Sequence, residues 1–348
     1  MANAQSSGSS SGEGITDILG SSNFSDSFAP SNPPQRTPIE TEYPDIEGLP
    51  DGVSVSRVEY LTNRHLKVYI KSAAMPDKEQ VVQIQLARDW YSNPDKKFPE
   101  VWALDGLRAR DDESGWTIET NILSQYADRN VNLIMPVGGE SSFYSDWQKE
   151  DNGKHYMWET FLANELPAYL EGNFGVARNN NSLAGLSMGG TAAITLAGKH
   201  PEQFRQALSY SGYLTTTLPG AQTFMRLALL DAGGFNINAM YGSVINPKRF
   251  SNDPFNLIPE LAAHGTDVFI SAASAIPGPL DQQRYKPEHI ASGMALEGFA
   301  NATTRMWELK ARAMGVRLQT NYPAQGLHNW EQFGYELEHS KPQVLNVM

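Results

Sequence analysis

The chain has 348 residues, with 27 Lys and Arg against 39 Asp and Glu, so its formal net charge is −12. An acidic protein offers no basic surface for phosphate backbones, which argues against nucleic acid as a partner. Cysteine is absent, so disulfides and thiol catalysis are excluded. No apolar run approaches the roughly 20 residues that span a bilayer, so no integral membrane segment is expected.

The first 50 residues differ in composition from the rest of the chain. They hold seven acids and one base, ten serines by Ser31, and six prolines between Pro30 and Pro50. Such a segment buries too little apolar surface to offset its chain entropy. We expect residues 1–50 to be a flexible acidic N-terminal segment and residues 51–348 to be a single domain. A division into two domains near Pro99 would need a linker-like composition that the sequence lacks there.

The N-terminus itself carries a small-x-small pattern, Ala2-Asn3-Ala4 followed by Gln5. Signal peptidase cleaves after patterns of this kind, although no apolar stretch precedes this one. We expect an exported protein, secreted or held in the cell envelope, whose signal peptide has been removed. The alternative is a chance pair of alanines in a flexible tail.

From Val53 onward the pattern becomes that of a folded domain. Residues 53–60, 66–72 and 80–87 alternate or cluster β-branched and apolar residues, as strands do. Short apolar runs typical of strands buried on both faces then recur at 101–104, 131–137, 182–185, 207–211, 268–271 and 316–320. Helical spacing lies between them, notably over 158–170 and 287–314. These patterns predict an α/β fold with a mostly parallel central sheet, antiparallel N-terminal strands, and helices on both faces.

The run Gly185-Leu186-Ser187-Met188-Gly189 matches the G-x-S-x-G motif of α/β-hydrolases. An apolar run leads into it and an Ala-rich helical pattern, 191–200, leads out. A serine on such a turn is strained and lies at a helix N-terminus, which favours developing negative charge. We interpret Ser187 as a nucleophile; the alternative is an ordinary Gly-rich turn between a strand and a helix.

A serine hydroxyl needs a base to take its proton, and histidine suits that task. In α/β-hydrolases the histidine follows the last strands. His328 comes after the predicted strand 316–320 through a turn-rich segment, whereas His339 fits an exposed helical position. Chain order leaves the acid open, and the candidates after Ser187 include Asp231, Asp253, Asp267, Asp281, Glu288, Glu297 and Glu308. Glu297 stands out, because its neighbours are apolar and a lone carboxylate there would need a partner.

Several runs resemble the mycolyltransferases of the mycobacterial antigen 85 group, which are esterase D-like α/β-hydrolases. They include 104–109, 135–139, 141–147, 158–162, 185–188, 231–234, 252–254 and 326–330. The run 141–147, Ser-Ser-Phe-Tyr-Ser-Asp-Trp, is specific to this group. The likeness extends from about Val53 to the C-terminus. The missing cysteines and the long N-terminal segment of residues 1–50, which we call the lead-in, look more like the corynebacterial branch.

This resemblance implies an acyltransferase that moves mycolic acyl chains from trehalose monomycolate to trehalose, giving trehalose dimycolate, or to other cell-envelope hydroxyls. It implies a serine acyl-enzyme, no cofactor, no metal and a monomer. One rival reading is a carboxylesterase of the same fold that hydrolyses small esters. Another is a non-catalytic adhesion or scaffold protein of the envelope.

Residue roles follow from the resemblance motif by motif. It makes Ser187 the nucleophile, His328 the base and Glu297 the acid. It assigns the oxyanion hole to the main-chain N–H groups of Leu107 and Met188, and sugar binding to Asp105, Arg108 and Trp330. Two places depart from the group: Thr117-Ile118-Glu119 stands where the group has an Asn near the sugar, and Arg110 replaces a Gln. We therefore expect the acceptor pocket to differ in fine preference.

Overall fold

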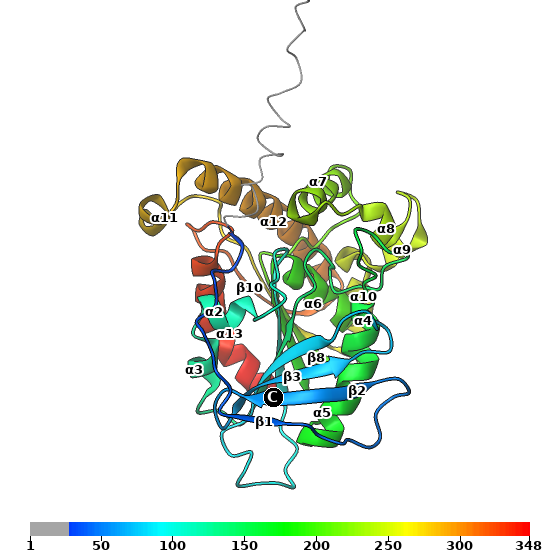
Figure 1. Cartoon of the computed structure of the whole chain (residues 1–348). Coiled ribbons are helices and arrows are strands. Elements are labelled where there is room, and N and C mark those ends of the chain that lie inside the picture. Colours follow the sequence, from blue (N-terminus) through cyan, green and yellow to red (C-terminus); the bar gives the residue numbers. More distant parts are fainter. Residues whose placement is uncertain (1–27) are drawn as a thin grey trace, which may run out of the picture.

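The computed structural model describes residues 28–348. The pattern at residues 2–5 and most of the serines of the lead-in lie outside these described residues. The described part is built around one ten-stranded mixed sheet with the order β1-β2-β3-β4-β6-β5-β7-β8-β9-β10. Figure 1 shows this sheet between two layers of helices.

The strands follow the predicted runs closely. Their bounds are β1 (Glu40–Glu42), β2 (Ser54–Tyr60), β3 (His65–Lys71), β4 (Gln80–Gln85), β5 (Glu100–Leu104), β6 (Asn132–Val137), β7 (Asn181–Leu186), β8 (Phe204–Tyr210), β9 (Asp267–Ser271) and β10 (Arg317–Asn321). The pairings from β1 through β4 to β6 are antiparallel, and those linking β6, β5, β7, β8, β9 and β10 are parallel. The predicted α/β fold, with its antiparallel start and parallel remainder, is confirmed.

The α-helices are α2 (Gly115–Glu119), α3 (Ile122–Tyr126), α4 (Trp158–Thr160), α5 (Leu166–Phe174), α6 (Met188–Lys199), α7 (Ala221–Gly233), α8 (Ile237–Tyr241), α9 (Pro247–Ser251), α10 (Ile258–His264), α11 (Pro279–Arg284), α12 (Pro287–Ala313) and α13 (Trp330–Val347). A π-helical turn, η2 (Phe161–Glu165), joins α4 to α5, and a 3₁₀ turn, η3 (Pro254–Asn256), precedes α10. The predicted helix over 287–314 is present as α12. The one expected over 158–170 is present but passes through the π turn.

Two apolar cores lie on opposite faces of the sheet. In β5, Trp102 and Leu104 belong to one core and Val101 and Ala103 to the other, as the two-residue period of a strand requires. The first core is shared with helices such as α5, α6 and α10, and the second with α2, α3 and α13. Burial on both faces explains why these strands read as continuous apolar runs in the sequence.

The described part of the lead-in lies against the domain. Strand β1 pairs with β2, although its three exposed residues carry no apolar signal in the sequence. We call residues 28–36 the strap. Arg36 Nε donates to Glu113 Oε1 at 2.6 Å, and Pro30 is buried. In Figure 1 this segment runs from β1 past α2 and α13 towards α12.

Candidate active site

Ser187 lies on the sharp turn between β7 and α6. Its backbone has φ 51° and ψ −120°, a left-handed conformation that is costly for a residue with a side chain. Glycines allow β7, the start of α6 and the segment after β5 to approach one another closely. A Cβ on Gly185 would lie 2.2 Å from the Gly189 carbonyl oxygen, and a Cβ on Gly189 would lie 2.4 Å from the Asp105 carbonyl oxygen. The turn holds the Ser187 hydroxyl at the N-terminus of α6.

His328 and Glu297 complete a hydrogen-bonded line with this serine. The hydroxyl of Ser187 lies 2.8 Å from His328 Nε2, and His328 Nδ1 lies 2.9 Å from Glu297 Oε2. An ionised carboxylate only accepts, so Nδ1 carries the proton and Nε2 is free to accept from the serine. Ser187 and Glu297 are 110 residues apart along the chain, and Glu297 and His328 are 31 residues apart. The structure thus brings together three candidates that are distant in the sequence.

Glu297 is fully buried and is held by two further donors. The Ser211 hydroxyl donates to Oε1 at 2.8 Å and the Ala273 N–H at 2.6 Å. Ser211 follows β8 and Ala273 follows β9, so the carboxyl ends of two parallel strands fix the carboxylate. These bonds compensate the burial of the charge. Of the acids that chain order left open, Glu297 is the one that contacts His328.

Tyr213 is a site residue that sequence reasoning missed. Its ring stacks on the His328 imidazole with centroids 5.9 Å apart and an interplanar angle of 17°. Burial raises the pKa of the Tyr213 phenol above its ordinary value, so the hydroxyl stays protonated. The only sequence signal was its place two residues after Ser211, just beyond a predicted strand.

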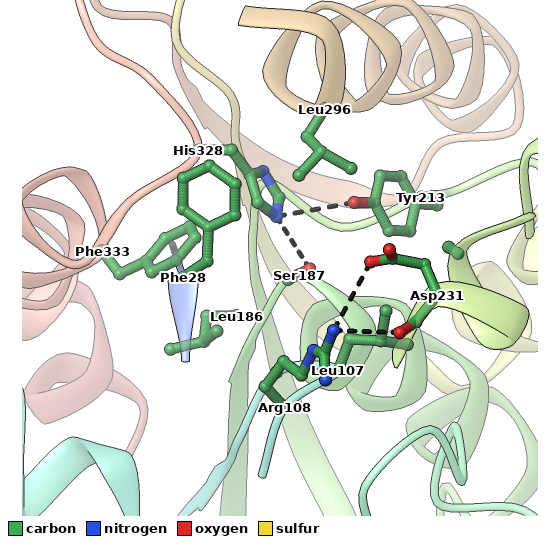
Figure 2. A pocket seen from close by; sticks show the side chains of 12 residues that line it. Phe28, Leu107, Arg108, Leu186, Ser187, Tyr213, Asp231, Leu296, His328 and Phe333 are labelled. Carbon is green, nitrogen blue, oxygen red and sulfur yellow. Dashed lines mark hydrogen bonds and ion pairs between the residues drawn. The ribbon is translucent and has the colours of Figure 1, made fainter. Parts of the chain in front are cut away.

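Figure 2 shows a small pocket above Ser187. Its free volume is about 40 Å³, and it is lined by Phe28, Gly106, Leu107, Arg108, Leu186, Ser187, Tyr213, Ala228, Asp231, Leu296, His328 and Phe333. Arg108 donates to the Ala232 carbonyl oxygen at 2.7 Å and lies 3.5 Å from the Asp231 carboxylate, which ties it to the end of α7. Of the expected oxyanion-hole residues, Leu107 lines this pocket together with Ser187, and Met188 follows Ser187 directly in the chain.

The three expected sugar-binding residues are not placed together. Arg108 lines the pocket with Ser187, whereas Asp105 and Trp330 are not among its lining residues and both lie next to Gly115. Asp105 is fully buried, which raises its pKa to about 7, and its Oδ2 accepts the Gly115 N–H at 3.1 Å. A Cβ on Gly115 would lie 2.6 Å from the Trp330 ring.

Neither a membrane span nor a metal cluster is found within residues 28–348. No helix in this range is both long and apolar enough to cross a membrane. No group of three or more His, Asp or Glu side chains in the same range is arranged to hold a metal ion.

Comparison with known proteins first gives the class. Residues 72–344 match the family model "Esterase". The S-formylglutathione hydrolase of Agrobacterium tumefaciens has the same fold, with a TM-score of 0.60 at 14% identity over 85% of this chain and 100% of that one. The protein is an α/β-hydrolase of the esterase family.

The comparison then gives the particular family. The diacylglycerol acyltransferase/mycolyltransferase Ag85B of Mycobacterium avium is 39% identical over 255 residues, 72% of this chain and 76% of that protein. Ag85C of Mycobacterium leprae is 36% identical over 253 residues, 71% of this chain and 74% of that protein. The structure of Mycobacterium tuberculosis MPT51 (FbpC1) superposes with a TM-score of 0.69 at 25% identity, over 79% of this chain and 96% of that one. The chain belongs to the antigen 85 mycolyltransferase family of acyl-transferring enzymes.

Proposed function

We propose that this protein transfers mycolic acyl chains from trehalose monomycolate to trehalose, or to another cell-envelope hydroxyl, through an acyl-enzyme on Ser187. The observation that carries the proposal is the hydrogen-bonded line from Ser187 through His328 to Glu297, in a chain 39% identical to a mycolyltransferase. The proposal places the protein outside the cytoplasmic membrane, where mycolate esters and their acceptors meet.

The first half-reaction forms the acyl-enzyme. Ser187 Oγ attacks the ester carbonyl as its proton passes to His328 Nε2. Glu297 holds the Nδ1–H and stabilises the imidazolium that results. The N–H groups of Leu107 and Met188 donate to the oxyanion, and donors in this role are worth about 3–4 kcal/mol each. The tetrahedral intermediate then collapses, and the sugar oxygen leaves with the proton from His328.

The second half-reaction repeats these steps in reverse. His328 takes the proton of an acceptor hydroxyl, whose oxygen attacks the acyl carbon and releases Ser187. Arg108 borders the reacting atoms and is fixed by Asp231 and Ala232, so it is placed to hold a sugar hydroxyl. Transfer requires that this hydroxyl reach the acyl-enzyme before water does.

A carboxylesterase acting on small esters is the second candidate. The observation that favours it is the free volume of about 40 Å³ above Ser187, which accommodates a short acyl group better than a long one. Such an enzyme would use the same three side chains with water as the acceptor.

Incubation of the purified protein with trehalose monomycolate separates the two candidates. We expect trehalose dimycolate and free trehalose, detected by mass spectrometry and thin-layer chromatography, and no product from Ser187→Ala. Free mycolate as the sole lipid product would identify the esterase. Absence of both lipid products would contradict either function.

A further inference from the structure

The strap is anchored to the domain along its length. The Asn32 side chain lies 3.3 Å from Arg110 Nη1, and the Ser31 N–H donates to the Glu119 carboxylate. Pro30 Cγ lies 2.8 Å from the point where a Cβ on Gly115 would be. With the Arg36–Glu113 ion pair described above, these contacts run from one end of the strap to the other. Arg110 and Glu119, which lie at the two places where we expect departures from the antigen 85 group, are therefore bonded to the strap.

At the end of the strap, Phe28 enters the pocket above Ser187. Its ring lies edge-on to the His328 imidazole with centroids 6.1 Å apart (Figure 2). It packs against the small cluster of Tyr213, Leu296 and Ala300. Among residues 28–50, no other side chain lines the pocket.

With Phe28 in place, the pocket is too small for a long acyl chain. A single water needs about 10–15 Å³ of such volume, so about 40 Å³ holds only a few waters. Sites for ligands of drug size have about 300–1,000 Å³. The catalytic side chains are thus assembled beneath a pocket that the substrate of the proposed reaction cannot enter.

The strap also lies near Asp105 and Trp330, two of the expected sugar-binding residues. Ala29 and Ser31 line one cleft together with Glu119 and Trp330. Two buried polar atoms next to Gly115, Asp105 Oδ1 and Trp330 Nε1, have no hydrogen-bond partner within residues 28–348. Buried polar atoms normally have partners, so these two atoms retain hydrogen-bonding capacity for a bound group.

We propose that Phe28 is a selectivity-determining residue and that the strap competes with substrate for the active site. Short acyl groups reach Ser187 with the strap in place. Long acyl groups reach it only when Phe28 leaves the pocket, and release of the strap opens the region beside Asp105 and Trp330 to the acceptor. This proposal rests on the proposed role of Ser187 as the residue that is acylated.

Phe28→Ala tests the proposal directly, with Tyr43→Ala as the matched control, because Tyr43 is an aromatic of the same lead-in that is 78% exposed. The measurement is kcat/KM for p-nitrophenyl dodecanoate and for p-nitrophenyl acetate. Phe28 is partly buried, and withdrawing a fully buried phenylalanine changes an equilibrium constant roughly ten- to hundredfold, so the lower end of that range applies here. We expect Phe28→Ala to raise the dodecanoate-to-acetate ratio at least about tenfold, and Tyr43→Ala to leave it unchanged.

A second variant keeps Phe28 and loosens its anchors. Arg110→Ala combined with Glu119→Ala should raise the same ratio, by less than Phe28→Ala does. A ratio equal to that of Tyr43→Ala in both variants would overturn the proposal. A fall in kcat/KM for the dodecanoate in Phe28→Ala would also overturn it, because Phe28 would then be a residue that binds the acyl chain of the substrate. Failure of the wild-type protein to react with either ester would instead refute the role of Ser187.

Hydrogen exchange in the wild-type protein gives an independent readout. Ser187 would be modified with a methyl or a dodecyl fluorophosphonate, and exchange of the backbone N–H groups of residues 28–36 would be followed by mass spectrometry. We expect faster exchange with the dodecyl group only. Equal exchange in the methyl and dodecyl adducts would contradict displacement of the strap.

Discussion

Glu297 shows how a single carboxylate is restricted to one geometry. One of its oxygens accepts from Ser211 and Ala273, which leaves the other to face His328 Nδ1. Because all of these groups are buried, water cannot replace a missing partner. The orientation of the imidazole therefore depends on donors supplied by the ends of two strands.

This geometry predicts the effect of Glu297→Gln. The amide oxygen would keep the two donors, so the amide N–H₂ would face Nδ1 and force the proton onto Nε2, where it blocks the serine. We expect kcat to fall about 10³- to 10⁴-fold with little change in KM. Steady-state kinetics with a short p-nitrophenyl ester measure both.

Glu308→Gln on the same helix is the control for this substitution. Glu308 bonds Arg312 and Tyr322, away from the site. It should retain wild-type kcat. A loss of less than tenfold in Glu297→Gln would show that Glu297 does not orient the base.

At the scale of elements, the start of α6 is determined by close backbone crossings rather than by helix propensity. Gly189 faces the carbonyl oxygens of Leu104 and Asp105, and Gly185 faces that of Gly189. These oxygens belong to β5, the turn after it and the first turn of α6, while Gly185 itself lies near the end of β7. The strain at Ser187 is thus maintained by two strands and a helix packed too closely for any side chain.

Gly189→Ala should disrupt this packing. Its Cβ would meet main-chain atoms at 2.4 and 2.5 Å, which cannot rotate away as a flexible side chain could. We expect a loss of about 3 kcal/mol or more in the free energy of unfolding, together with lower activity. Urea denaturation followed by circular dichroism gives the first quantity.

Gly172→Ala is the matched substitution in a helix with free space. Gly172 lies in α5, and a Cβ placed on it would meet no atom of another element of residues 28–348 within 4 Å. We expect a gain of about 0.5–1 kcal/mol, since alanine loses less backbone entropy than glycine in a helix. Equal effects of Gly189→Ala and Gly172→Ala would contradict the crossing argument.

At the scale of the whole molecule, a carboxyl in the central sheet links stability to pH. Glu100 begins β5 and is 1% exposed, and burial raises its pKa to about 8. Between its ordinary value and pH 8 the folded chain holds a proton that the unfolded chain has lost. The contribution of Glu100 to stability therefore falls as pH rises through this window and is constant above it.

Glu100→Gln removes this dependence. We expect the free energy of unfolding of the variant, relative to wild type, to rise by about 1.4 kcal/mol per pH unit between pH 4.5 and 8. Denaturation at intervals of one pH unit would measure it. A difference that does not change with pH would show that Glu100 ionises normally in the fold.

The sequence predicted the sheet because its strands are short apolar runs, and it predicted the turn at Ser187 from a motif with a local geometric cause. His328 followed from its place after the last strand. Glu297 could not be chosen from chain order, because Ser211 and Ala273, which hold it, come from other strands; the resemblance singled it out. Phe28 was not singled out, since the few aromatics of a serine- and proline-rich segment form no strand or helix pattern that would mark one of them.

Strand β1 has a consequence for how the strap can be studied. It is three residues long, fully exposed, and carries Glu40 and Glu42, so it ends the sheet with repelling charges at a short edge. Cutting the chain after residue 42 would remove β1 together with the strap and expose the longer edge of β2. A bare edge invites a second copy to pair with it and precipitate. A truncation that removes the strap should therefore end before Glu40, so that β1 stays paired with β2.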